Sequence, residues 1–497
     1  MAKITNIFVL MLENHSFDNI FALSGIDGIA AATTADTNTY HNQPYAVQSG
    51  APVTMPTDPG HEFLDVFEQL AGADAVFNPT QPYPAIVNSG FASNYATSRS
   101  EGVPPAAADI GKIMACFDTA TQLPVIHQLA TQFAICDHWF SSLPGPTWPN
   151  RFFAHGASSN GLDHSPTDTE MAQWDSIEGF QFPNGSIYDA LTQKKLAWRI
   201  YNDNRDADSD DPQNRLGAIA QVAALKGIHL TDVRSLSDLA ADLQGNYPFV
   251  YTFLEPNYGN VLNNTYEGGS SQHPRDYVHG GESLLKRVYE AIRNSPLWES
   301  SLLIVTYDEH GGFYDSVPPG PAVAPGDTQG KSPYNKYSFN FEQLGVRVPA
   351  VVISPLIPAG TVDPTVYDHS SILATIERQF GLGALTARDR SANDLLHLLT
   401  LPAARGDCPA QLVEPALAAP KAAAVPADIE EQPLPASGTA RGLLAIAAKT
   451  DFELSTGSDN EKAAIVQTHH KIHTRGQARD YSNEVMKKVD AARAGRR

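Results

Sequence analysis

The stretch LIVTYDEHGG, Leu303 to Gly312, ends an apolar run with two adjacent carboxylates, Asp308 and Glu309. An uninterrupted apolar run of this length is typical of a strand that is buried on both faces of a sheet. In open α/β sheets, ligands bind at the carboxyl ends of the strands. Two carboxylates at such a position repel each other unless a cation lies among them. The stretch therefore predicts a buried strand that ends in a carboxylate pair, which is either a cation site or an acidic surface loop.

Further apolar runs of the same kind occur along the chain, with helical patterns between them. Strands that alternate with helices form a parallel sheet with helices on both faces, so the sequence predicts an α/β fold. The helical patterns cover residues 282–295 and 370–381, the second with Ser370 as N-cap and Gly381 as its stop. The predicted strands are NIFVLML (6–12), FAIC (133–136), PFVYTFL (248–254), SLLIVTY (301–307) and VPAVVIS (348–354).

The composition is that of a well-buried globular enzyme. Of 497 residues, 42% are apolar and 18% are charged, which argues against a disordered chain. The formal net charge of −21 at pH 7 repels nucleic acid phosphates and opposes nonspecific binding to anionic membranes. We therefore expect no nucleic acid partner and at most transient membrane contact. The widely spaced Cys116, Cys136 and Cys408 predict reduced thiols instead of a disulfide framework or a CxxC metal site.

The first apolar run, Ile7 to Leu12, is followed by no small-residue cleavage site and is too short to span a bilayer. We interpret it as a strand. A cytoplasmic protein is the default expectation, with export by a leaderless route or the trimming of a leader as alternatives.

The composition changes near residue 402, where a stretch rich in Ala and Pro begins. Such a stretch is typical of an extended linker or of a strap on the main domain. We therefore predict a catalytic domain over residues 1–401 and a C-terminal extension over residues 402–497.

The last part of this extension is basic, with nine Lys or Arg against four Asp or Glu from Asn460 onward. Apolar residues recur there at helical spacing, which predicts an amphipathic helix. The helix is either held on the surface by a few contacts or acts as a lid or membrane contact. The residues at this spacing are Tyr481, Val485, Val489 and Ala492.

Oxygen ligands also follow the first predicted strand, where ENHSFDN begins with Glu13 and Asn14. Together with Asp308 and Glu309 they would bring three carboxylates and an amide to one sheet edge. An all-oxygen set suits Ca, Mg or Mn, with Zn as an alternative. Each motif alone could be an acidic surface loop or a helix cap. Two such clusters at strand ends favour one divalent metal ion.

The stretch SSLPGPTWPNRF (141–152) holds Thr147 among prolines, just before a predicted helix start at NRFFAHG. A helix N-terminus binds phosphate through its free N–H groups. A hydroxyl held there on a metal could lose its proton and attack phosphorus. On this stretch alone, Thr147 is equally consistent with a helix cap.

Two histidines lie in polar loops, His61 in DPGHEF and His273 in SSQHPRD. Each could donate to phosphoryl oxygens or protonate a leaving alkoxide, although a single histidine is more often an ordinary surface or capping residue. We interpret His310 and His369 as supporting or cap residues.

These motifs, in this order and spacing, resemble the bacterial phospholipase C and acid phosphatase AcpA family of phosphoesterases from Ile4 to about Thr400. The resemblance implies an alkaline-phosphatase-like, three-layer α/β/α sandwich with a mostly parallel central sheet. It also implies a bound metal and a Ser or Thr nucleophile. By position, it implies metal binding by Glu13, Asn14, Asp308 and Glu309, a nucleophile that also touches the metal at Thr147, and phosphate binding by His61 and His273.

The expected function is that of a metal-dependent phospholipase C, which hydrolyses phosphatidylcholine-type phosphodiesters through a phosphothreonine intermediate. The alternatives are an acid phosphatase acting on small phosphomonoesters and, from another class, a catalytically silent lipid- or phosphate-binding protein. A sulfatase is disfavoured because no C-x-P-x-R signature is present. The aromatic loops at 77–87 and 89–98 could stack on a choline headgroup or simply pack.

Overall fold

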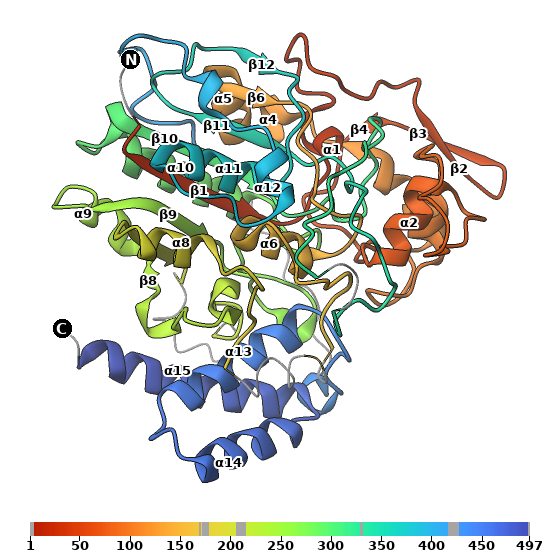
Figure 1. Cartoon of the computed structure of the whole chain (residues 1–497). Helices are drawn as coiled ribbons and strands as arrows, with labels where there is room; N and C mark the ends of the chain where they lie inside the picture. Colours follow the sequence, from red (N-terminus) through yellow and green to blue (C-terminus); the bar gives the residue numbers. More distant parts are fainter. Residues whose placement is uncertain are drawn as a thin grey trace.

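An eight-stranded sheet forms the centre of the molecule (Figure 1). The computed structural model describes residues 4–167, 170, 178–204, 215–328, 332–415 and 427–495. The strand order is β12-β6-β11-β10-β1-β9-β7-β8. The strands are β1 (Asn6–Leu12), β6 (Ala134–Cys136), β7 (Ala197–Asn202), β8 (Arg234–Ser235), β9 (Phe249–Glu255), β10 (Ser301–Tyr307), β11 (Ala350–Ile353) and β12 (Thr361–Asp363).

All five predicted strands are present, and the predicted α/β class with a mostly parallel sheet is confirmed. β11 is the exception to the parallel pattern, since it pairs antiparallel with both β10 and β6. A parallel neighbour needs a crossover, usually a helix. The described residues between β10 and β11, 308–328 and 332–349, contain no helix, so the chain turns back beside β10 without crossing the sheet.

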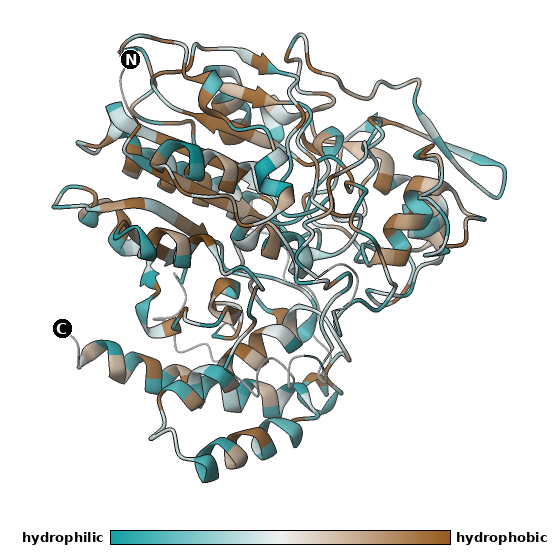
Figure 2. Cartoon of the chain, viewed as in Figure 1, coloured by the Kyte–Doolittle hydropathy of each residue, from teal (hydrophilic) through white to brown (hydrophobic). Residues whose placement is uncertain are grey.

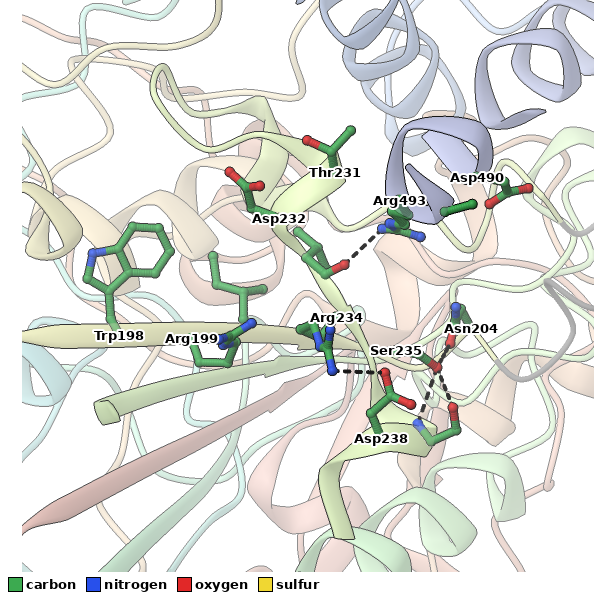
Figure 3. Close-up of a pocket in the computed structure, with 14 residues that line it drawn as sticks. Trp198, Arg199, Asn204, Thr231, Asp232, Arg234, Ser235, Asp238, Asp490 and Arg493 are labelled. Carbon is green, nitrogen blue, oxygen red and sulfur yellow. Dashed lines mark hydrogen bonds and ion pairs between the residues drawn. The ribbon is translucent and has the colours of Figure 1, made fainter. Parts of the chain in front are cut away.

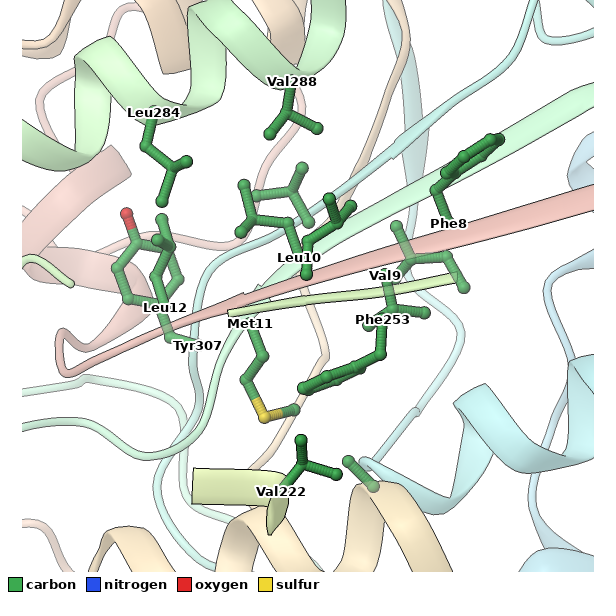
Figure 4. Close-up of a cluster of buried hydrophobic side chains, with 14 of the residues drawn as sticks. Phe8, Val9, Leu10, Met11, Leu12, Val222, Phe253, Leu284, Val288 and Tyr307 are labelled. Atoms are coloured by element: carbon green, nitrogen blue, oxygen red, sulfur yellow. The ribbon is translucent and has the colours of Figure 1, made fainter. Parts of the chain in front are cut away.

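The central strand β1 is buried on both faces, which explains its continuous apolar run. Figure 4 shows Leu10 on the side of Leu284 and Val288 from α10, while Met11 lies on the opposite side near Val222. Each large apolar side chain buried in this way stabilises the fold by roughly 1.5–3 kcal/mol. The hydropathy colouring shows the same distribution, with hydrophobic strands inside and hydrophilic residues on the outer helices (Figure 2).

Helices cover the sheet and continue beyond it (Figure 1). α5 packs against α10, and α6 packs against α11. Within the described ranges, no helix is both long and apolar enough to cross a membrane. The longer helices are α2 (Phe63–Ala71), α3 (Phe91–Thr97), α5 (Pro124–Gln132), α6 (Thr147–Gly156), α8 (Ile187–Gln193), α10 (His279–Arg293), α11 (Ser370–Phe380), α13 (Thr439–Glu453), α14 (Asp459–His470) and α15 (Arg475–Ala494).

Shorter elements complete the described chain, together with two small two-stranded sheets, β2 with β3 and β4 with β5. The short strands are β2 (Thr37–Tyr40), β3 (Gln43–Ala46), β4 (Gln48–Ser49) and β5 (Ala115–Cys116). The short helices are α1 (Phe17–Phe21), α4 (Thr119–Gln122), α9 (Leu239–Asp242) and α12 (Ala387–Ser391). The three cysteines are buried free thiols, as predicted.

α11 ends as predicted but begins differently. Gly381 terminates it in a left-handed conformation with φ of 67°, which glycine adopts at little cost. Ser370 is the first helical residue instead of the N-cap, a position held by His369. The reason is that the carboxylate of Asp368 already accepts a hydrogen bond from the Ser370 N–H at 3.0 Å, so the first turn is capped from outside the helix.

The predicted C-terminal amphipathic helix is confirmed and is longer than its apolar spacing indicated. Tyr481, Val485 and Val489 are buried in α15, whereas Ala492 is partly exposed. α15 packs on α13. The boundary at residue 402 and the lid stay predictions.

The end of α15 is held against the edge of the sheet. Arg493 donates hydrogen bonds to the carbonyls of Leu230 at 2.7 Å and Val233 at 2.8 Å. These contacts border a pocket of about 980 Å³ beside the edge strand β8, with Arg199 and Arg234 also on its wall (Figure 3). None of its lining residues is among the predicted site residues.

Candidate active site

The carboxyl ends of β1 and β10 form the floor of the site. The two strands are parallel neighbours, with Leu12 opposite Tyr307. Glu13 and Asn14 therefore leave the sheet beside Asp308 and Glu309, and all four side chains are buried. The structure thus brings together the two oxygen clusters that the sequence places at one sheet edge.

Thr147 meets this floor from the N-terminus of α6. The helix begins at Thr147, three residues before the predicted start, with Pro146 as N-cap. Its hydroxyl lies 3.3 Å from the Nδ2 of Asn14. The preceding loop is fixed by Asn150, whose amide donates to the carbonyls of Gly145 at 2.9 Å and Pro146 at 3.1 Å. Thr147 lies in the first turn of α6, and its hydroxyl contacts Asn14 at the strand end. No capping hydrogen bond from its side chain to the helix backbone is among the described contacts.

Arg151 is a site residue that the sequence motifs did not single out. It lies one turn after Thr147 in α6 and is buried. Its Nε donates to the Oδ2 of Asp308 at 2.8 Å, and its Nη2 lies 3.9 Å from the Oε2 of Glu13. Spacing of four residues places two side chains on the same helix face. That spacing from Thr147 is the signal that could have found it.

The floor carries more negative charge than Arg151 can balance. Burial and the nearby Asp308 raise the pKa of Glu13 well above its ordinary value. Burial also raises the pKa of Asp308 to about 6, although Arg151 opposes the shift, and burial raises the pKa of Glu309 to about 8. Three buried carboxylates beside one guanidinium form a site that is stabilised by a further cation.

The free oxygen atoms of the floor fit a divalent cation. Both carboxylate oxygens of Glu13 and the Oδ1 of Asn14 are buried without a hydrogen-bond partner. The Nδ2 of Asn14 contacts both Thr147 and Glu309. If the amide group were rotated by 180°, its Oδ1 would instead lie beside the oxygens of Thr147 and Glu309. Among the described residues, no three His, Cys, Asp or Glu side chains form a metal-binding group by themselves. The oxygens of Asn14 and Thr147 are the other candidate ligands here, and an all-oxygen set suits a hard ion.

His61 lies beside several carboxylates that favour its charged form. Its Nδ1 donates to the carbonyl of Pro59 at 2.9 Å, and its Nε2 lies 3.7 Å from the Oε1 of Glu101. Burial alone would lower the pKa of His61, but Glu101, Glu309 and Asp58 raise it well above the ordinary value. The imidazolium form is a proton donor at neutral pH.

His273 is held in the neutral form. Burial and the nearby charge of His61 lower the pKa of His273 well below its ordinary value. The backbone N–H of Arg275 donates to its Nδ1 at 3.2 Å, so the ring proton is on Nε2, which lies 3.6 Å from the Oδ2 of Asp58. The two rings are 6.2 Å apart. The predicted histidine pair thus consists of one charged and one neutral donor.

His369 and His310 support the β10 strand end. The Nε2 of His369 donates to the carbonyl of Asp308 at 2.6 Å, and the Nε2 of His310 donates to the Oε1 of Gln69 at 2.7 Å. Both were predicted as supporting or cap residues, and His369 is also the N-cap of α11.

The aromatic loops pack internally. Phe77 lies against Phe63 with ring centroids 4.9 Å apart, and Tyr83 lies 5.4 Å from Phe67. Phe91 is buried in a core cluster. Of the two interpretations of these loops, the contacts favour packing over a choline site.

Known proteins resemble this chain over most of its length. Residues 4–383 match the Phosphoesterase family. Non-specific phospholipase C5 of Arabidopsis thaliana is 36% identical over 437 residues, which cover 83% of this chain and 77% of the relative. Non-specific phospholipase C3 of the same plant is 33% identical over 430 residues, covering 83% and 76%. Phospholipase C B of Mycobacterium tuberculosis is 27% identical over 434 residues, covering 80% and 77%.

Solved structures resemble the chain more distantly. A protein in the alkaline phosphatase superfamily from Vibrio parahaemolyticus is 12% identical, with a TM-score of 0.33 and coverage of 79% of this chain and 71% of that one. Murine ectonucleotide pyrophosphatase/phosphodiesterase 5 is 10% identical, with a TM-score of 0.33 and coverage of 56% and 94%. The family match and the curated relatives confirm the resemblance that the sequence motifs indicate: the chain belongs to the Phosphoesterase family.

Proposed function

We propose that this phosphoesterase is a metal-dependent phospholipase C that cleaves phosphatidylcholine-type phosphodiesters. Family membership sets the reaction class, the hydrolysis of phosphoester bonds. The phospholipase C names of its plant and mycobacterial relatives support the phosphodiester substrate. The observation that carries the proposal is the Thr147 hydroxyl at the N-terminus of α6, beside Asn14 and the buried carboxylates.

The cation would be held by oxygen atoms of the floor, and Ca, Mg or Mn suits this set better than Zn. Bound there, a divalent ion would favour the alkoxide form of Thr147 and neutralise negative charge on the phosphoryl oxygens. Arg151 keeps two of the carboxylates in place through its contacts to Asp308 and Glu13. The proposed ligands are Glu13, Asn14, Thr147, Asp308 and Glu309.

The side chains around the floor have separate tasks in the proposed reaction. The Thr147 oxygen attacks phosphorus in line with the leaving alcohol, which gives a phosphothreonine intermediate. The His61 imidazolium donates its proton to the departing oxygen and, once neutral, accepts a proton from the water that hydrolyses the intermediate. The Nε2–H of His273 and the free N–H groups at the start of α6 donate to the phosphoryl oxygens.

Two other functions use part of the same arrangement. An acid phosphatase would attack a phosphomonoester with the same groups, and a silent phosphate- or lipid-binding protein would bind without turnover. A binding module has no need for a hydroxyl beside an oxygen cluster, so the position of Thr147 favours an enzyme.

The test compares turnover of p-nitrophenylphosphorylcholine and p-nitrophenyl phosphate, each with and without EDTA and after divalent ions are restored. We expect faster turnover of the choline diester, loss of turnover in EDTA, and recovery with Ca, Mg or Mn. Preference for the monoester would establish the phosphatase instead. No turnover of either compound with any divalent ion would leave the binding protein as the function.

A further inference from the structure

The ring of Tyr266 lies flat against His273. The ring centroids are 3.5 Å apart and the planes differ by 5°. Both side chains are buried, with 8% and 3% of their surfaces exposed. The hydrogen bond from the Arg275 N–H fixes the tautomer of His273. The stacked tyrosine ring fixes the orientation of the imidazole plane, which that hydrogen bond alone does not.

Tyr266 occupies this position at a cost to its backbone. Its φ is 54°, a left-handed conformation that bulky residues rarely adopt. The loop around it enforces this conformation. The N–H of Tyr266 donates to the carbonyl of Asn260 at 3.2 Å, and the carbonyl of Tyr266 accepts from the N–H of Gly269 at 3.3 Å. A Cβ on Gly259 would collide with the same carbonyl. Strain of this kind persists where the surrounding structure over-determines it, often at functional sites.

The first turn of α13 lies near the hydroxyl of Tyr266. Burial raises the pKa of Tyr266 well above its ordinary value, and the Thr439 side chain opposes this shift. One turn later in the same helix, Gly442 lies so close to Trp148, the neighbour of Thr147, that a Cβ would overlap the indole. α13 thus packs against Trp148 and lies near Tyr266, whose other side is the ring of His273.

We propose that Tyr266 is a positioning residue that holds the His273 ring so that its Nε2–H points at a phosphoryl oxygen. This inference rests on the proposed phosphoesterase function. A donor aimed at developing charge contributes mainly in the transition state. Loosening the imidazole should therefore lower kcat and leave KM nearly unchanged.

The decisive comparison is Tyr266→Phe against Tyr266→Leu. Both variants keep a large apolar residue on the same strained backbone, but only phenylalanine keeps a flat ring against His273. We expect kcat on p-nitrophenylphosphorylcholine to fall by about tenfold to a hundredfold in the leucine variant, part of the effect of losing one donor, with KM within about threefold. The phenylalanine variant should stay within about threefold of the parent protein. Equal activity of the two variants would overturn the inference.

A double-mutant cycle tests whether Tyr266 acts through His273. In a His273→Gln background, Tyr266→Leu should change kcat by less than about twofold, because nothing is left to position. An undiminished effect in that background would show an independent role and refute the inference. Tyr266→Asn repeats the test if the leucine variant does not fold, since asparagine tolerates the left-handed backbone. An inactive parent protein would overturn the proposed function and this inference together, whereas an active parent with silent variants would overturn the inference alone.

Discussion

The hydroxyl of Thr147 lies 3.3 Å from the side-chain amide of Asn14, although 133 residues of chain separate the two. One belongs to the loop after the central strand β1, and the other is the first residue of α6. Their contact joins the N-terminus of a helix, where backbone N–H groups are free to bind an anion, to the oxygen-rich end of a sheet. The predictions below concern this junction and the charges around it.

Replacing Thr147 by alanine should remove activity without unfolding the protein. Loss of the nucleophile closes the covalent route, so turnover of the preferred chromogenic ester should fall by at least about a thousandfold. The free energy of unfolding should change by no more than about 1 kcal/mol, as for a lost helix cap. Thr147→Ser keeps a hydroxyl and should retain measurable turnover. An alanine variant as active as the serine variant would exclude Thr147 as the nucleophile.

Arg151 should be essential for stability. Arg151→Met removes the cation that contacts Asp308 and Glu13, and breaking a buried ion pair in this way costs about 3–5 kcal/mol. Arg378→Met is the matched control, because the partly exposed Arg378 pairs with Asp394 at 2.9 Å on the surface, and such pairs contribute about 0–1 kcal/mol. Urea denaturation measures both. Equal losses in the two variants would mean that the carboxylates do not depend on Arg151.

A divalent ion should stabilise the folded protein as well as activate it. At a hundredfold excess over its dissociation constant, a ligand adds about 2.7 kcal/mol to the free energy of unfolding, which corresponds to a rise of about 3 °C in Tm for a chain of this length. EDTA should reverse this rise. Glu13→Gln removes a carboxylate from the proposed ligand set and should remove most of the response.

Glu282→Gln provides the control for this thermal shift. Glu282 is also a buried carboxylate, but it accepts hydrogen bonds from the N–H groups of Val125 and Ile126 at 2.7 and 3.0 Å. The variant is expected to be less stable, yet its Tm should still rise with the ion. A response that is unchanged in Glu13→Gln would place the ion elsewhere.

The sequence predicted the parts of the fold and site that local patterns encode. Continuous apolar runs identified β1, β6, β9, β10 and β11, and the rule that ligands collect at strand ends brought Glu13 together with Asp308. β8 and β12 have two and three residues, which is too short for a periodicity. Glu101 and Tyr266 reach the site only through tertiary packing against His61 and His273. No spacing in the sequence indicates such contacts.

The direction of β11 and the start of α6 depended on longer-range features. A buried strand has the same apolar pattern in either direction, so only the absence of a helix in the described part of the connection from β10 reveals the antiparallel pairing. Because of Pro149, the predicted start of α6 lies after this residue. Proline is tolerated in the first turn, because its missing N–H would have no partner within the helix.

A pH-dependent contribution to stability should come from His164, outside the proposed site. Its Nδ1 lies 3.0 Å from Asp163, and its Nε2 lies 3.0 Å from Glu170. Asp163 in turn accepts hydrogen bonds from the N–H groups of Lys336 and Tyr337 at 3.0 and 2.9 Å. Burial would lower the pKa of His164, but the two carboxylates raise it to about 9. The imidazolium therefore links Glu170 to Asp163, the carboxylate that holds the backbone at 336–337.

Because the folded pKa of His164 lies above the ordinary value of about 6.5, the charged pair contributes fully below pH 6.5. The contribution is lost as the pH rises through 9. We expect His164→Gln to be less stable than the parent at pH 6, and the difference to shrink by at least about 1 kcal/mol at pH 9.5, a figure that allows for solvent screening. His229→Gln is the control, since His229 pairs with Glu453 at 3.1 Å while half exposed, and its stability difference should vary less between these pH values. Urea denaturation of the three proteins at both pH values measures these stabilities. If the stability difference between His164→Gln and the parent stays constant or grows as the pH rises, the folded protein does not hold His164 as a cation.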